Sequence, residues 1–456
     1  MKTIRTTTAA AIVRFLRAQY VRRDGVEHRL IRGVCGIFGH GNVTGLGQAL
    51  EEHGGTALPY LQPKNEQSGV HTAIAYAKTL RRLGTLACTS SIGPGATNMV
   101  TGAATATINR LPVLLLPGDT FASGAPAPVL QQLENPASSG VSVNDCFRPV
   151  SRFWDRITRP EQILTVLPEA MRVLADPAQT GAVTVALPED VQAEAFDFPV
   201  SFFEERVHEI ERTTPPADRL RQAVTLIRAS RRPLIIAGGG VHYSDACAAL
   251  RALADATGVP VAVTQAGKGA VLESHALGLG AVGVTGTLCA NRIAAEADLV
   301  LVVGTRLSDF TTASKTLFQD PGVQFVAVNT NAADAAKHGA LPLVGDARAT
   351  LQALTRALRR WHAPAAHARA VARARRDWEA PWRSMVRPAR RPADGRLYTS
   401  EVIGLLNEHA DAGSTVVHAA GGIPGDIHKL WRGRTETDYH AEYGYSCMGY
   451  EIAGAL

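Results

Sequence analysis

Short apolar runs that alternate with helical segments are the feature that most constrains the fold of this chain. Residues 111–116, 182–187 and 299–303 are each almost continuously apolar, and each is separated from the next run by helix-forming sequence. Strands that are apolar on both faces occur in parallel sheets that helices cover on both sides. The sequence therefore predicts an α/β fold built of doubly wound parallel sheets.

The number of such runs divides the chain into blocks. A length of 456 residues exceeds one ordinary core. The expected organisation is a first domain at 1–200, a central domain at 217–358, a basic linker at 359–397 and a third domain at 398–456. The third block shows one strand, near 415–419, and two helix starts. We expect that domain to be incomplete in this chain.

The cysteines, the apolar runs and the charges of the chain exclude several classes of protein. The six cysteines are scattered and form no C-x-x-C pair, so neither a disulfide framework nor a cysteine metal site is expected. Free cysteines are typical of a reducing compartment, and we expect a cytoplasmic location. No apolar run reaches the length of a membrane span, so no membrane partner is expected. The net charge of +6 lies largely in the arginine-rich stretch 359–391. Acidic Asp377 and Glu379 within it favour an exposed helix and linker over a nucleic-acid-binding surface, and we expect no nucleic acid partner.

A glycine triplet at 238–240 follows an apolar strand and raises the alternative of a dinucleotide site. The G-x-G-x-x-G spacing would require glycine where Tyr243 stands, and no acidic ribose partner is evident. A tight turn is the better interpretation.

Residues 65–71 open a helix whose apolar positions fall on one face, with Glu66 on its first turn. A lone carboxylate there would signify only a favourable charge at the helix dipole. Downstream, however, come a Gly-Pro-Gly turn at 93–95 and the apolar strand 111–116. This order resembles the pyrimidine-binding domain of thiamine-diphosphate enzymes. The resemblance implies that Glu66 touches the aminopyrimidine ring of the cofactor.

Longer runs extend the likeness over the whole chain except 359–391. Taken together, the blocks resemble enzymes of the acetolactate synthase type and, within them, the trihydroxycyclohexane-1,2-dione hydrolase family of myo-inositol breakdown. The runs that carry this resemblance are 38–42, 64–67, 154–162, 265–268, 286–288 and 442–451.

The resemblance implies a set of site residues. Its catalytic members would be Glu66, which shares a proton with the cofactor, and His40 and His71 as proton donors. The implied cofactor-binding residues are Glu66, Gly421, Gly422, Glu442, Cys447, Met448 and Gly449, and the implied pocket wall is Asn42, Gln67 and Phe121. Each has an ordinary structural alternative, since single histidines and methionines are often core residues.

The implied cofactors are thiamine diphosphate and Mg²⁺, with the Mg²⁺ ligands expected beyond Leu456. The implied reaction is hydrolytic cleavage between the carbonyls of a cyclic polyol 1,2-dione, giving 5-deoxy-glucuronate. The family likeness also implies a homodimer or a dimer of dimers with active sites between subunits. Two alternatives stay open: an acetolactate synthase-like carboligase, with a flavin in the central block, and a truncated, non-catalytic binding subunit.

Overall fold

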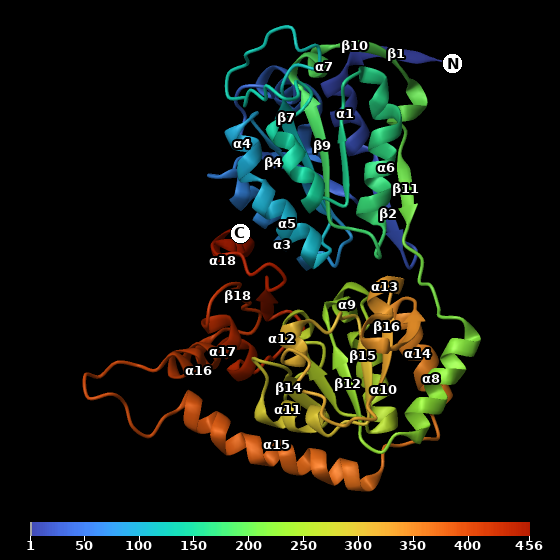
Figure 1. Cartoon of the computed structure of the whole chain (residues 1–456), viewed down its shortest axis with the longest axis vertical. Coiled ribbons are helices and arrows are strands. Elements are labelled where there is room, and N and C mark those ends of the chain that lie inside the picture. Colours follow the sequence, from blue (N-terminus) through green and yellow to red (C-terminus); the bar gives the residue numbers. More distant parts are fainter. Residues whose placement is uncertain (1) are drawn as a thin grey trace. The chain divides into compact units, whose positions relative to one another are not determined.

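The computed structural model describes residues 2–456 and divides into two compact units (Figure 1). The first unit comprises the chain up to Glu211 together with Cys447–Leu456, and the second comprises Arg212–Ser446. No helix among residues 2–456 combines the length and the apolar character that crossing a membrane requires.

A six-stranded parallel sheet forms the centre of the first unit. Its strand order is β5 (Tyr60–Leu61), β4 (Ile31–Gly36), β6 (Thr85–Ser90), β7 (Val113–Asp119), β9 (Ala182–Pro188) and β8 (Phe153–Arg156). Every residue of β6, β7 and β9 is buried, as the continuous apolar runs predict. The α/β class with parallel sheets is thereby confirmed.

Helices cover both faces of this sheet (Figure 1). One face carries α1 (Thr8–Arg17), α2 (Gln48–His53) and α6 (Ile163–Ala175), and the other carries α3 (Glu66–Thr79) and α5 (Val100–Asn109). Shorter elements of the unit are β1 (Thr3–Thr7) paired with β10 (Ala195–Pro199), α4 (Pro94–Asn98), α7 (Glu189–Ala193) and α18 (Tyr450–Ala455).

The start of the chain is partly as the sequence predicts. The sequence predicts a helix that Thr7 or Thr8 caps and whose apolar face runs from Ala9 to Tyr20. Thr7 caps α1 through its side-chain oxygen, which accepts a hydrogen bond from the Ala10 amide, so the cap is confirmed. The extension of the helix to Tyr20 is wrong, because Gln19–Arg23 forms β2, which pairs with the neighbouring strand β3 (Val26–Arg29) and with the distant strand β11 (Arg206–Glu209).

The second unit contains another six-stranded parallel sheet. Its order is β14 (Gly278–Ala281), β13 (Val261–Val263), β12 (Pro233–Ala237), β15 (Leu299–Val303), β16 (Gln324–Asn329) and β17 (Leu341–Val344). One face packs against α8 (Ala217–Ala229), α10 (Cys247–Thr257) and α14 (Ala347–Leu358), and the other against α11 (Leu288–Ala295). Short helices α9 (Gly239–Tyr243), α12 (Asp309–Thr312) and α13 (Ala332–Ala335) follow strand ends.

The arginine-rich stretch holds one long helix, α15 (Ala365–Val386), 22 residues in length. Its buried side chains include His367, Val371 and Ala374, and His367 Nε2 lies 2.9 Å from the Pro233 carbonyl oxygen. The arginines occupy mostly the exposed face. The expected exposed helix is present, and it packs along α11 rather than spanning free solvent.

The third block adds α16 (Thr399–His409), β18 (Val416–His418), α17 (Ile423–Leu430) and β19 (Tyr439–Ala441) to the second unit. Strands β18 and β19 pair in parallel. The sequence indicates only the first of these strands, because β18 begins with the apolar pair Val416 and Val417, whereas β19 has His440 at its centre and follows a polar segment. The boundaries of a separate third domain stay a prediction.

Candidate functional site

Glu66 is the first residue of α3, as the sequence predicts. The helix starts there because Asn65 has extended backbone angles and its side-chain oxygen accepts a hydrogen bond from the Ser68 amide at 3.2 Å. The backbone of Glu66 is therefore fixed at the start of a helix. Glu66 is half-buried rather than buried, since residues 60–65 before it are mostly exposed.

The Gly-Pro-Gly turn lies against this carboxylate. Asn98, at the end of α4, donates its side-chain amide to Glu66 Oε2 over 2.9 Å. A Cβ placed on Gly95 would lie 3.1 Å from Glu66 Oε1 and 2.4 Å from Ser91 Oγ. One carboxylate oxygen is thus held by an amide, while the other faces a residue that has no side chain. Asn98 is a site residue that sequence reasoning missed, although it stands only three residues after the Gly-Pro-Gly turn.

Gln67 and Cys447 lie together in the first unit. Gln67 Nε2 is 3.5 Å from Cys447 Sγ, and Thr72 donates its hydroxyl to the Ala453 carbonyl at 2.9 Å. These contacts hold α18 against α3. Gly449, whose φ is +88°, precedes α18, a backbone conformation that favours glycine.

His71 and Met448 have opposite environments. His71 is 1% exposed, and its ring centroid lies 5.4 Å from that of Tyr450 on α18. Its surroundings are those of a core residue between two helices. Met448 is 80% exposed, so its side chain is open to a ligand or to another protein surface.

The loop after β4 carries His40 and Asn42. Asn42 is buried; its Oδ1 accepts from the Gly39 amide at 2.9 Å, and its Nδ2 donates to Thr89 Oγ1 at 3.2 Å. Asn42 therefore fastens the loop to β6, and its amide is already engaged. His40 is half-exposed, with Nε2 3.7 Å from a Glu189 carboxylate oxygen.

Phe121, which is half-buried, begins the long loop 120–142 after β7. Arg156 anchors the base of this loop: it donates to buried Asp119 at 2.7 Å and to Asp145 at 2.8 Å. The loop also reaches the glycine turn, since a Cβ on Gly93 would lie only 1.8 Å from the Gln131 carbonyl oxygen. Phe121 is thus carried by a segment that touches the turn beside Glu66.

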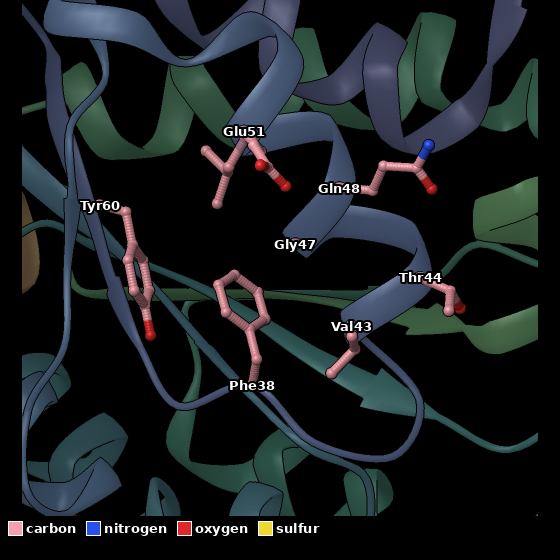
Figure 2. A pocket seen from close by; sticks show the side chains of 8 residues that line it. Phe38, Val43, Thr44, Gly47, Gln48, Glu51 and Tyr60 are labelled. Atoms are coloured by element: carbon pink, nitrogen blue, oxygen red, sulfur yellow. The ribbon is translucent and has the colours of Figure 1, made fainter.

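A surface pocket of about 590 Å³ lies in the first unit beside the loop after β4 (Figure 2). The rings of Phe38 and Tyr60 form one wall, with centroids 4.9 Å apart, and the Glu51 carboxylate lies across from them. The pocket is lined by Phe38, Val43, Thr44, Gly47, Gln48, Leu50, Glu51 and Tyr60. Since Glu66 does not line it, this pocket is separate from the Glu66 carboxylate.

The remaining predicted residues lie at one edge of the β18–β19 pair in the second unit. Gly421 and Gly422 follow β18, and Glu442 follows β19, so all three stand at the carboxyl ends of parallel strands. Ligands of α/β sheets bind at such ends. Gly421 has φ +92°, and a Cβ on either glycine would meet nothing within 4 Å, so the turn has an open side.

Glu442 is 2% exposed. Its carboxylate accepts from the Tyr445 amide at 2.9 Å, and its own amide donates to the His418 carbonyl at 3.0 Å. Glu442 therefore shapes the segment that directly follows β19. Residues 2–456 hold no group of three or more histidine, cysteine or acidic side chains arranged to bind a metal, and the Mg²⁺ ligands stay a prediction.

Two protein families match parts of this chain, and one of the matches includes the residues around Glu66. Residues 6–138 match the family described as thiamine pyrophosphate enzyme, N-terminal TPP binding domain, and residues 220–354 match its central domain. Thiamine pyrophosphate is the cofactor called thiamine diphosphate here. The first match contains Glu66 and its Asn98 partner.

Curated relatives match over all of this chain. It is 49% identical to the 3D-(3,5/4)-trihydroxycyclohexane-1,2-dione hydrolase of Geobacillus thermodenitrificans and 47% identical to that of Clostridium tetani, covering 74% of each. The chain is also 47% identical to the 3D-(3,5/4)-trihydroxycyclohexane-1,2-dione hydrolase 2 of Bacillus cereus, again over all of this chain and 74% of the relative. The resemblance stated from the sequence is confirmed. The chain therefore belongs to the thiamine pyrophosphate enzymes and, within them, to the family of the 3D-(3,5/4)-trihydroxycyclohexane-1,2-dione hydrolases.

Proposed function

We propose that this chain is a thiamine-diphosphate-dependent hydrolase that opens 3D-(3,5/4)-trihydroxycyclohexane-1,2-dione with water to give 5-deoxy-glucuronate in myo-inositol degradation. The observation that carries the proposal is the 49% identity over the whole chain to a hydrolase of that name. The small-molecule substrate is a neutral polyol, so its recognition calls for hydrogen-bonding groups rather than for a charged pocket. The free cysteines support a cytoplasmic location.

The residues around Glu66 fit the pyrimidine end of the cofactor. Thiamine diphosphate, when bound, supplies the carbon nucleophile for attack on a carbonyl. Glu66 would hold and return a proton at a ring nitrogen of the aminopyrimidine. Asn98 occupies Oε2, which leaves Oε1 for that contact, and Gly95 lets the turn pack closely against this carboxylate because it has no side chain.

The open turn of Gly421 and Gly422 would hold the diphosphate, and Mg²⁺ would offset its negative charge. We assign 398–456 to a diphosphate-binding domain on this basis. Glu442 would hold the following segment in place through the Tyr445 amide. Met448, largely exposed, would support the thiazolium ring with its apolar side chain.

For the substrate, we propose that His40 moves a proton at the carbonyl that water attacks. Its half-exposed ring and the nearby Glu189 carboxylate suit this role. Gln67 and Phe121 would form the pocket wall. Buried His71 and fully engaged Asn42 would act by holding α3 and the β4 loop in place.

The proposed reaction has a direct assay. The purified protein is mixed with thiamine diphosphate, Mg²⁺ and the dione, and the products are followed by mass spectrometry and by titration of released acid. Ring opening adds one water and releases one proton for each dione consumed. A protein that leaves the dione intact but converts pyruvate to acetolactate would be a carboligase instead.

A further inference from the structure

Lys268 is a buried cation in the second unit. Its side chain is 2% exposed, and its Nζ lies 2.6 Å from Glu273 Oε1 and donates to the His428 carbonyl at 2.9 Å. A lysine is rarely buried unless it is paired, because removing the charge from water is costly. Its burial therefore calls for an explanation beyond packing.

The carbonyl that Lys268 binds belongs to the last turn of α17. Carbonyls there lack partners within the helix, and a cation near them is favourable for the helix dipole. Trp382 Nε1 donates to a second such carbonyl, that of Leu430, at 2.9 Å. Glu273 pairs with Lys268 and holds the segment after the helix, since its other oxygen accepts from the Gly433 amide at 3.3 Å. Side chains distant in sequence thus supply the C-terminal cap of α17.

The first turn of α17 is held by Gln265, which belongs to the same short segment as Lys268. Gln265 is buried; its Nε2 donates to the Pro424 carbonyl at 3.2 Å, and its Oε1 accepts from the Tyr439 hydroxyl on β19. The His428 ring is held as well, with Nδ1 2.8 Å from Thr285 Oγ1. Through these hydrogen bonds, the segment 265–268 contacts α17 near both of its ends.

The hydrogen bonds from Gln265 and Lys268 to α17 bear on the position of the Gly421–Gly422 turn. Gly422 caps α17 and Gly421 directly precedes it, so any shift of α17 moves both. On the side where a Cβ would stand, neither glycine meets an atom of residues 2–456 within 4 Å, and the Gly422 carbonyl is bonded only to amides of α17. Its position depends on the elements that flank it, and the flanking strand β18 has only three residues.

We propose that Gln265 and Lys268 are positioning residues that hold α17 so that the Gly421–Gly422 turn can receive the diphosphate of the cofactor. The inference rests on the proposed function, which places the diphosphate at that turn. Neither residue is expected to touch the cofactor. Their loss should weaken cofactor binding and leave the chemistry of the bound state largely unchanged.

The sharpest variant is Lys268→Met combined with Glu273→Gln. It removes both charges together, so no unpaired charge stays buried, and the amide oxygen of the new side chain keeps an acceptor for the Gly433 amide. The matched control is Lys337→Met combined with Asp334→Asn, which removes a lysine–carboxylate pair of similar length, 2.7 Å, within the α13 region of the same unit. Gln265→Met is a milder second variant, for use if the first no longer unfolds cooperatively.

Three readouts are taken with the whole protein: hydrogen exchange of residues 423–430 by mass spectrometry, the dissociation constant of thiamine diphosphate with Mg²⁺ by calorimetry, and kcat at saturating cofactor. Loss of one charge-assisted hydrogen bond should weaken cofactor binding about tenfold. Exchange in α17 should accelerate, and kcat should stay within about twofold of the parent value because no group at the reacting atoms is altered. The control should match the parent in all three.

Unchanged exchange and unchanged cofactor affinity in both variants would overturn the inference while leaving the proposed function standing. A fall in kcat at saturating cofactor without loss of affinity would also overturn it, since it would place Lys268 in the chemistry. If the parent protein itself binds no thiamine diphosphate, the proposed function falls and this inference falls with it.

Discussion

The side-chain amide of Asn98 donates to Glu66 Oε2 over 2.9 Å and joins the end of α4 to the start of α3. The bond orients a carboxylate that would otherwise rotate freely at a helix end. The second oxygen, Oε1, faces Gly95, where a Cβ would lie 3.1 Å from it, so the close approach of the two segments depends on a residue without a side chain.

Asn98→Ala should lower activity by about ten- to a hundredfold, because a hydrogen bond to a charged group contributes about 1.5–3 kcal/mol. The fold should be unaffected, since Asn98 is exposed and at the helix end. The check is kcat with the dione at saturating cofactor. Asn109→Ala, at the end of α5, is the matched control and should be neutral for activity. Equal activity of Asn98→Ala and the parent would show that orientation of Glu66 does not depend on this amide.

Gly95→Ala should weaken cofactor binding. The added Cβ would lie 2.4 Å from Ser91 Oγ and 3.1 Å from Glu66 Oε1, so it would push aside the carboxylate that is proposed to meet the pyrimidine ring. Calorimetry with thiamine diphosphate and Mg²⁺ measures the effect. Gly140→Ala in the same unit, where a Cβ would meet nothing within 4 Å, is the control. Wild-type affinity in Gly95→Ala would argue against a ring at this position.

Arg156→Met should destabilise the first unit by about 3 kcal/mol, since it leaves the buried Asp119 carboxylate without its cation. Arg148→Met is the control: its side chain is 57% exposed, and its pair with Asp145 should contribute less than about 1 kcal/mol. Denaturant unfolding at neutral pH compares the two. Similar losses in both variants would contradict the importance of the buried pair.

The same network predicts a pH dependence. Burial raises the pKa of Asp145, but hydrogen bonds from Arg156 and the Ser142 amide outweigh it and leave the pKa below its usual value. A lowered pKa in the folded state means that the stabilisation is present above the unfolded value, about 3.9, and is lost as the pH falls through the folded value. The gap in unfolding free energy between the parent and Arg156→Met should therefore narrow in acid. A gap that stays constant down to about pH 3 would rule out this contribution.

If active sites are shared between subunits, dimers formed from two differently inactivated subunits should regain activity. Glu66 lies in the first unit and Gly421 in the second, so the two can be inactivated separately. We expect Glu66→Gln mixed with Gly421→Val to recover part of the activity when subunits exchange, because one site in the hybrid would be intact. Exchange is verified with labelled subunits. No recovery despite proven exchange would place each site within a single chain.

Local patterns account for the parts of the fold that the sequence predicts. The continuous apolar runs determine buried parallel strands such as β7 and β9, and Thr7 determines the start of α1. Glu66 is found at its helix start for the same reason, since Asn65 is a strong capping residue.

The parts that sequence missed depend on contacts between distant segments. Strand β19 has no apolar run that would indicate it, since His440 stands at its centre, and it pairs with β18 from 20 or more residues away. The cap of α17 joins Lys268 to His428, 160 residues apart. Likewise, the hydrogen bond between Asn98 and Glu66 joins residues 32 positions apart and forms only when α4 packs beside α3. Such pairs follow from topology, and no spacing rule along the chain indicates them.

Exchange of the thiazolium C2 proton of bound thiamine diphosphate, followed by NMR in deuterated water, tests the central claim most directly. We expect rapid exchange in the parent protein and loss of that acceleration in Glu66→Gln, which keeps an oxygen for Asn98 but cannot share a proton with the cofactor. Glu51→Gln, in the separate pocket of the same unit, should exchange like the parent. Exchange in Glu66→Gln as fast as in the parent would contradict the assignment of Glu66.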